Sequence, residues 1–463
     1  MIHGKLEHMN CWASLRQEEL PTLNSTSNTH TGTFDDAGGT TLTDAAAAFP
    51  TTGVGLVGWT VIITSGTGVW EWRLITANTA TTLTVASLTT DATSNYTVFP
   101  DLSVQTTVKK YTAAAKLDFL PGNGMGWRAH TFINTAAGTL NAAHGRWIYV
   151  NAAPTATTAC TIFGLNDDGI LGVGVGIGND RKLTIISSDD ATVHQIRATG
   201  SLALTLDTWY WVAIQGRPTI PAVAAYADAD VRVYNTSGTL VDSFSATGFY
   251  AAGYFFNEAF IGSRTLSAGA GMVVYLDGGI AVSGSGVWPP ICPDFWSAAP
   301  TGVGATSQWT SSAGGDKWLD VDETPHTSDT DYIYSTSTGQ TQLFTFPASG
   351  IGTVNIRAVG IGHYLRAVSA SILTVHGMTL GSSYTAVPAL TTTYSSSSHG
   401  MYDMQKATTP AGGEWTTANL DDVVSRVATF GAVATERRCT NVVKFACYGG
   451  TYPSRRRRRG VVV

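Results

Sequence analysis

The sequence predicts an all-β protein, made of several β-sandwich or jelly-roll modules with few short helices. Its 463 residues are enough for about three domains of ordinary size. Aromatic residues are plentiful (13 Trp, 17 Tyr and 16 Phe) and are mixed with 50 Gly, a composition that favours strands and tight turns. Short apolar runs bounded by turn residues recur along most of the chain, as in multi-domain β proteins.

The composition argues against a disordered chain and against a nucleic-acid-binding surface on the body of the protein. The hydrophobic fraction of 43% is too high for disorder. Charged residues make up only 13%, against roughly 25% in an average soluble protein, which suggests that neighbouring chains cover much of the surface. The net charge is −6 although the run Arg455–Arg459 is basic, so the rest of the chain is acidic. This run is interpreted as a solvated tail or, alternatively, as a segment that binds an acidic neighbour or nucleic acid.

The sequence carries no recognisable export or membrane signal. Its beginning, MIHGKLEHMNCWASL, lacks the basic region and apolar run of a signal peptide, and no stretch approaches the ~18 apolar residues of a membrane span. We therefore expect synthesis in the cytoplasm and no membrane partner. The cysteines lack zinc-site or disulfide-scaffold spacing and are expected to be buried free thiols, with a pair on neighbouring strands as the alternative for the last two: Cys11, Cys160, Cys292, Cys439 and Cys447.

The first two segments are an arm and a small module. Residues 1–30 show no clear period and are expected to form a docking arm, with a short helix around Trp12–Leu20. Residues 31–104 are expected to form a small antiparallel β module, in which Trp70, Trp72 and Leu74 alternate with charged residues as in a half-buried strand. The string TTLT, which occurs at 40–43 and 81–84, is a weak internal repeat.

Residues 105–290 are expected to form the largest module, a two-sheet jelly roll. Strand candidates lie at 129–133, 146–151, 160–165, 170–177, 182–186, 208–215, 230–234, 259–261 and 272–276. The run TWYWVAI at 208–214 precedes a hairpin with its turn at Asn235–Gly238, and AFIGS at 259–263 and VYLDGGIAVS at 274–283 follow. This order resembles the laminin-G-like, concanavalin-A-like jelly roll. The chain departs from that pattern after Asp277, where Gly-Gly stands in place of a second acid.

Residues 291–305, rich in Pro and Gly, are expected to be a linker between the jelly roll and a β-rich module at 306–450, and 451–463 a basic tail. Leu420, Val423, Val424 and Val427 recur at helical spacing and predict one short helix, capped by Thr417 or Asn419.

The third module and the first are similar to known phage structural modules. In the third, the similarity rests on Trp309, the acidic stretch ending in DTDYI at 329–333, FTFPAS at 344–349, EWTTANLDDV at 414–423 and the strand at 441–448. In the first module, the similarity rests on the sequence stretch that runs from TTLT at 40–43 to LITANTATTLTV at 74–85. The resemblance implies a virion setting and no particular activity.

No catalytic, cofactor-binding or metal site is assigned from the sequence. The Gly-Ser tracts at 284–286 and 381–383 lack the strand–turn–helix context of a nucleophile elbow. The run GVGVGIG at 172–178 lacks the Lys-Ser/Thr of a phosphate loop and more simply allows a neighbouring strand or chain to approach closely. His130, His194 and His376 are expected at ordinary strand positions.

Calcium is the one cofactor with candidate ligands, although solvated turns are the favoured interpretation of each cluster. The clusters are Asn166-Asp-Asp-Gly, Ser188-Asp-Asp, Asp228-Ala-Asp and Asp320-Val-Asp-Glu, all rich in the oxygens that Ca²⁺ requires, yet none matches an EF-hand.

Three functions are compatible with these observations. The favoured one is a non-enzymatic structural component of a phage-type virion (a capsid decoration, fibre or tail-associated protein) that packs with other virion proteins and is expected to form a homo-oligomer. The alternatives are a carbohydrate-binding adhesin for host attachment and, third, a polysaccharide depolymerase, since fold is weak evidence for function.

Overall fold

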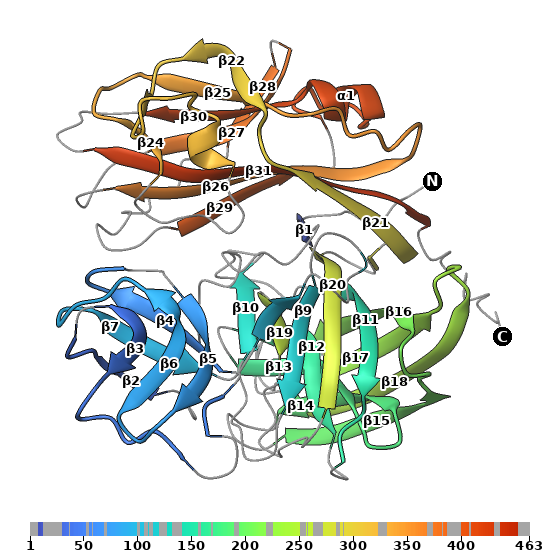
Figure 1. The fold of residues 1–463 in the computed structure, drawn as a ribbon. Helices are drawn as coiled ribbons and strands as arrows, with labels where there is room; N and C mark the ends of the chain where they lie inside the picture. The colour runs from blue at the N-terminus through green and yellow to red at the C-terminus, as the bar shows by residue number, and fades with distance from the viewer. Residues whose placement is uncertain are drawn as a thin grey trace.

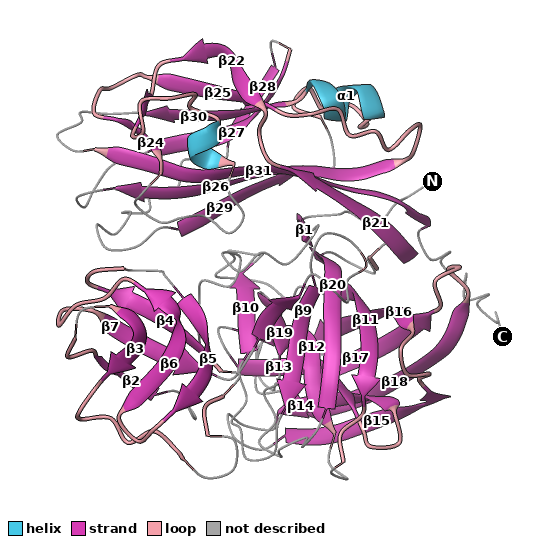
Figure 2. Cartoon of the chain, in the orientation of Figure 1, coloured by secondary structure: helices cyan, strands magenta, loops and turns pink. Residues whose placement is uncertain are grey.

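The protein folds almost entirely into antiparallel strands, grouped in three bodies (Figures 1 and 2). The computed structural model describes residues 8–12, 30–36, 38–51, 55–57, 59–68, 72–99, 102–105, 110, 114–119, 127–131, 141–155, 159–167, 170–188, 194–218, 226–250, 256, 258–262, 272–283, 288–289, 291–322, 331–367, 374–381, 383–386, 400–406, 409–429 and 436–451. The all-β class predicted from the sequence is confirmed.

The first body is a six-stranded antiparallel sheet in the order β2-β7-β4-β5-β6-β3. Its strands are β2 (His30–Thr33), β3 (Gly39–Thr43), β4 (Thr60–Ser65), β5 (Trp72–Asn78), β6 (Thr82–Leu88) and β7 (Asn95–Phe99). The two TTLT strings lie in β3 and β6, which pair so that the fully buried Leu42 and Leu83 stand opposite each other. The side chains of Trp70, Trp72 and Leu74 lie outside the described residues, and the core residue that β5 supplies is Ile75.

The second body is the expected β-sandwich. One sheet, called the β11 sheet, has the order β18-β17-β16-β11-β20-β9-β8, and the other, the β13 sheet, has the order β10-β19-β12-β13-β14-β15. The β11 sheet contains β8 (Leu102–Gln105), β9 (Ala114–Phe119), β11 (Ala142–Ala152), β16 (Trp209–Pro218), β17 (Tyr226–Tyr234), β18 (Leu240–Tyr250) and β20 (Met272–Ser283). The β13 sheet contains β10 (Trp127–Thr131), β12 (Cys160–Asp167), β13 (Ile170–Ile177), β14 (Lys182–Ser188), β15 (His194–Ala203) and β19 (Glu258–Gly262).

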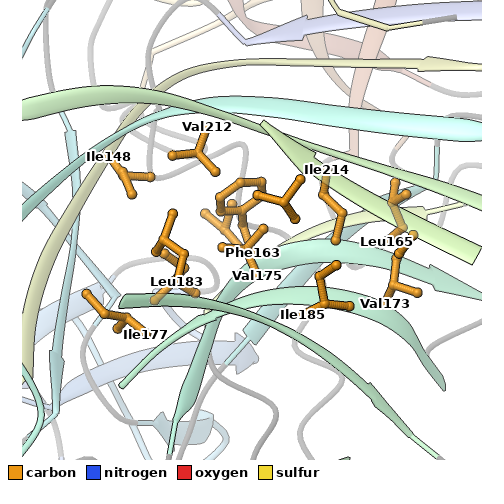
Figure 3. Packing of buried hydrophobic residues seen from close by; sticks show 14 of the residues in the cluster. Ile148, Phe163, Leu165, Val173, Val175, Ile177, Leu183, Ile185, Val212 and Ile214 are labelled. Carbon is orange, nitrogen blue, oxygen red and sulfur yellow. The ribbon is translucent and has the colours of Figure 1, made fainter. Parts of the chain in front are cut away.

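Alternating apolar side chains from the two sheets meet in one core. Ile148, Val212 and Ile214 point from the β11 sheet toward Phe163, Val173, Val175 and Ile185 of the β13 sheet (Figure 3). Each strand candidate of this module coincides with a strand, although Thr208 precedes β16 and residues 132–133 of the first candidate lie outside the described residues. The predicted hairpin turn is also present, with Gly238 at φ 79° and a backbone hydrogen bond from Asn235 N to Thr239 O.

The third body is a second two-sheet sandwich. One sheet, the β31 sheet, has the order β23-β24-β31-β26-β29 with β21 also paired to β31, and the other has the order β22-β25-β30-β27-β28. The strands are β21 (Ile291–Ala298), β22 (Gly302–Ser307), β23 (Thr310–Ser311), β24 (Ile333–Ser335), β25 (Thr341–Thr345), β26 (Ile356–Ala367), β27 (Thr374–Leu380), β28 (Ser383–Ala386), β29 (Gly400–Lys406), β30 (Val424–Thr429) and β31 (Arg437–Thr451). Trp309, Phe344 and Trp415, which belong to the stretches behind the resemblance described above, are buried in its core.

Sequence predictions about several individual elements differ from the structure. The expected linker at 291–305 contains β21, which pairs along β31 and buries Phe295, and β22 follows it. The predicted short helix is present but spans only Thr417–Asp422 (α1). Val424 and Val427, expected in that helix, lie in β30, where Ser425 and Val427 are buried and Arg426 is half-buried. β-branched side chains such as those of valine favour strands over helices, which explains why a strand replaces the second half of the predicted helix.

The cap and the arm also differ from expectation. Thr416 caps α1 and forms a capping box with Asn419, in place of a cap at Thr417 or at Asn419 itself. In the arm, Trp12 ends strand β1 (His8–Trp12), which pairs with β20, while residues 13–20 lie outside the described residues.

The second and third bodies are joined by an apolar contact, called here the interdomain cluster. Trp147, Trp211 and Tyr234 lie on the face of the β11 sheet that is turned away from the sandwich core, and they pack against Phe295 and Phe445 of the third body. Trp147 Nε1 also donates a hydrogen bond of 3.1 Å to the carbonyl of Pro293. The remaining members are Ala143, Ile280, Val282, Ala358, Val443 and Cys447.

Candidate functional site

Three aromatic side chains form a row across neighbouring strands of the β11 sheet. Tyr149 on β11 stands directly opposite Trp209 on β16 and Tyr275 on β20. Its ring centroid lies 5.3 Å from that of Trp209 and 5.7 Å from that of Tyr275, with interplanar angles of 51° and 81°. Cross-strand pairs of this kind hold each other in fixed orientations. We call these three residues the aromatic row.

Strand alternation places the aromatic row on the outer face of the sandwich. On β11, Ile148 and Val150 enter the core, so Tyr149 between them points outward. Trp147 and Trp211 form the adjoining outward row, which the third body covers. The aromatic row is only half-buried, and Trp209 packs against the interdomain cluster. The aromatic row therefore lies at the edge of the surface that the third body covers.

Polar groups border the row. Asn151 Nδ2 donates a hydrogen bond of 2.8 Å to Asp207 Oδ1, and both residues are exposed. The backbone N–H of Asp207 donates to the carbonyl of Val150 at 2.9 Å, which ties the turn before β16 to the end of β11. Asp207 has a φ of 57°, the left-handed region that Asp and Asn tolerate better than most residues.

The hydroxyl of Tyr149 is coupled to this polar edge. The pKa of Tyr149 is raised, first by burial, then by its hydrogen bond with the Asp207 carboxylate and the charge of that group. The phenol therefore stays protonated and donates to Asp207. A half-buried aromatic surface beside a carboxylate and an amide fits a ligand with one apolar face and several hydroxyl groups.

The sequence assigns none of these residues to a site. Trp209 lies in the TWYWVAI run, whose alternation with Trp211 is a signal that could have found it. Tyr149, Tyr275, Asn151 and Asp207 were missed, because strands far apart in the sequence bring them together.

The four acidic clusters that the sequence offers as calcium ligands differ in their surroundings and in how much of each the structure describes. Arg217 forms ion pairs with Asp228, at 3.9 Å, and with Asp230. The arginine therefore balances the negative charge that a calcium ion would otherwise balance. The side chains of the clusters at 166–169 and 188–190 lie outside the described residues, as do Glu323 and those of His130, His194 and His376. Asp320 lies in a short 3-10 helix, η2 (Leu319–Val321), and its carboxylate approaches that of Asp331. Within the described ranges, no group of three or more His, Cys, Asp or Glu side chains gathers as a metal site.

The glycine and cysteine motifs have structural roles. The glycine run forms β13, and added side chains at Gly172 and Gly176 would meet Phe256 and Ile186, in line with the close approach expected there. Gly381 has a φ of 58° in the turn between β27 and β28, and 284–286 lies outside the described residues. Cys439 and Cys447 are buried and lie on the same strand, β31, which removes the neighbouring-strand alternative. Of the helices in the described ranges, none has the length and apolarity to cross a membrane.

Comparisons with known proteins yield only distant structural likenesses. No family model matches the chain. No curated protein matches it. An alginate lyase from Chlorella virus is similar at 8% identity, covering 39% of this chain and 88% of its own, with a TM-score of 0.27. Lectin II from Ulex europaeus (10% identity, 38% and 89% covered, TM-score 0.26) and domain 4 of an extracellular arabinanase from Geobacillus stearothermophilus (16%, 40% and 77%, TM-score 0.25) are similar to the same degree. At these identities and scores, the likeness carries no argument about what this chain binds or does.

Proposed function

We propose that the chain is a non-enzymatic carbohydrate-binding protein of the adhesin type, which binds a host-surface glycan at the aromatic row. The observation that carries this proposal is the juxtaposition of Trp209, Tyr149 and Tyr275 with Asp207 and Asn151 on an outer sheet face. A pyranose ring has an apolar C–H face that stacks on an aromatic ring and hydroxyl groups that pair with carboxylate and amide oxygens.

The charge at the site narrows the class of sugar. Asp207 is exposed and lies at the edge of the row, so it accepts hydrogen bonds from hydroxyl groups and repels a carboxylate or sulfate on the ligand. The ligand is therefore a neutral glycan. The third body covers the adjoining Trp147 and Trp211, so the glycan lies along the row and does not extend toward the interdomain cluster.

A glycan array followed by titration of the best neutral hit onto the full chain tests this proposal. Trp209→Ala is expected to weaken binding by about tenfold or more, and Asp207→Asn, which keeps a residue tolerant of positive φ, to weaken it less. Tyr226→Ala is the matched control, because Tyr226 is an exposed aromatic (42%) on the same sheet and outside the row. Circular dichroism of each variant verifies folding. A blank array, or equal loss in the Tyr226 variant, would contradict the proposal.

We further propose that the chain acts as a structural component of a phage-type virion, assembled in the host cytoplasm with other virion proteins. This is supported by the low charged fraction and by the third body, whose core is built from the residues that resemble phage structural modules. Mass spectrometry of purified particles should detect the chain, and light scattering should find a homo-oligomer. A monomer that is absent from particles would exclude this role. Release of reducing ends from envelope polysaccharide by the purified chain would instead favour a depolymerase.

A further inference from the structure

Two carboxylates face each other in the third body without a described cation between them. Asp320 on η2 is 2% exposed, and its Oδ2 is buried without a hydrogen-bond partner. Asp331, just before β24, likewise has a buried Oδ1 without a hydrogen-bond partner. The two side chains lie within hydrogen-bonding reach of each other, although an ionised carboxylate has no hydrogen to donate.

Within the part of the chain that the structure describes, the surroundings supply oxygen atoms to this pair and no ion pair with a cation. The Ser311 hydroxyl and the Ser312 backbone interact with Asp320. Asp322, directly after η2, lies close enough to Asp331 for the charges of the two carboxylates to interact. Of the nearby cations, Lys317 donates to Ser307, while the guanidinium of Arg438 binds Glu436 and lies over the Tyr332 ring.

Buried carboxylates in contact are stable only when a proton or a metal ion lies between them. In this pair, Asp320 Oδ2 and Asp331 Oδ1 are both buried and have no hydrogen-bond partner. A divalent cation supplies the missing positive charge. Calcium suits it better than magnesium, because calcium accepts irregular oxygen ligands, including hydroxyls, carbonyls and water.

We infer that Asp320 and Asp331 form a calcium-binding site in the third body, distinct from the aromatic row and independent of it. Bound calcium would fix η2 to the turn before β24, because Asp320 and Asp331 lie on these two segments.

Thermal unfolding of the full chain, stripped of metal with EDTA and titrated with calcium chloride at neutral pH, tests the site. A saturable rise in Tm is expected, with magnesium chloride giving a smaller one. Asp320→Asn should remove the calcium response and raise the Tm of the metal-free protein, because it abolishes the repulsion. Asp316→Asn is the matched control, since Asp316 is exposed one turn earlier and offers only its backbone carbonyl to Leu319.

Terbium luminescence gives a second measurement if the Asp320 variant does not fold. Terbium ions bound at the pair should be sensitised by Tyr332, next to Asp331, and calcium should displace them. Tyr332→Phe should reduce the emission while the calcium-induced rise in Tm persists. A calcium response that survives Asp320→Asn would overturn the inference. So would a metal-free protein that gains stability on acidification and does not respond to calcium, because the pair would then hold a proton.

Discussion

Lys444 is a fully buried cation that stabilises the end of α1. Its Nζ donates to the carbonyl oxygens of Leu420 at 2.9 Å and Val423 at 3.5 Å, groups that a helix of this length leaves unpaired. The rings of Phe346 and Trp296 lie 4.8 and 5.5 Å from the same nitrogen. Burial lowers the pKa of Lys444 to about 8, although the charges of Asp421 and Asp422 oppose the shift.

This lowered pKa predicts a pH-dependent stability with a definite sign. Between about pH 8 and the ordinary lysine pKa of 10.5, the unfolded chain binds the proton of Lys444 and the folded chain does not. The free energy of unfolding should therefore rise with pH across this window, by on the order of 3 kcal/mol at most. Below pH 8 the lysine is charged in both states and its contribution is constant.

Urea denaturation of the wild type and of Lys444→Met, measured between pH 7 and pH 10.5, isolates this contribution from other titrating groups. The difference in the free energy of unfolding between the two proteins should change in the wild type's favour as pH rises. A constant difference across the window would show that the folded pKa of Lys444 is not lowered.

At the scale of elements, close packing between β26 and β31 depends on a glycine. Gly360 stands opposite Phe445, and a methyl group at position 360 would collide with the Phe445 ring. Because Phe445 belongs to the interdomain cluster, it is held from the far side as well. Gly360→Ala should therefore lower the free energy of unfolding by about 1–3 kcal/mol, the usual cost of overpacking.

The matched control is Gly315→Ala in the same body. No atom lies within 4 Å of a methyl group placed there, so stability should change by no more than about 0.5 kcal/mol. Chemical denaturation of both variants provides the comparison. Equal effects would mean that the Phe445 ring moves aside without cost.

The elements also show what the sequence could predict. Local patterns located the strands of the sandwich and the Asn235–Gly238 turn, because alternation and turn chemistry are properties of neighbouring residues. They placed Val424 in a helix, because its position in β30 depends on pairing with β25 and β27, which lie far from it in the sequence. The aromatic row was out of reach for the same reason, since only the register of β11 against β16 and β20 sets Trp209 and Tyr275 beside Tyr149.

At the scale of the whole molecule, the interdomain cluster should make the second and third bodies unfold together. Large aromatic side chains from both bodies are buried in it, with Trp147 and Trp211 packed edge-to-face at 5.6 Å. Each such side chain contributes about 1.5–3 kcal/mol through burial. The core of the first body, by contrast, contains only residues 34–98. Calorimetry of the full chain should therefore show two transitions, one for the first body and one for the other two.

Two variants separate these transitions. Phe445→Ala should cost about 3–5 kcal/mol and broaden or split the shared transition, because it removes one of the two phenylalanine rings that the third body contributes to the cluster. Phe34→Ala, which removes a comparable ring from the first body, should lower only the other transition. Three separate transitions in the wild type would contradict the coupling. With coupling intact, the third body stays packed over Trp147 and Trp211, while the adjoining aromatic row stays only half-buried.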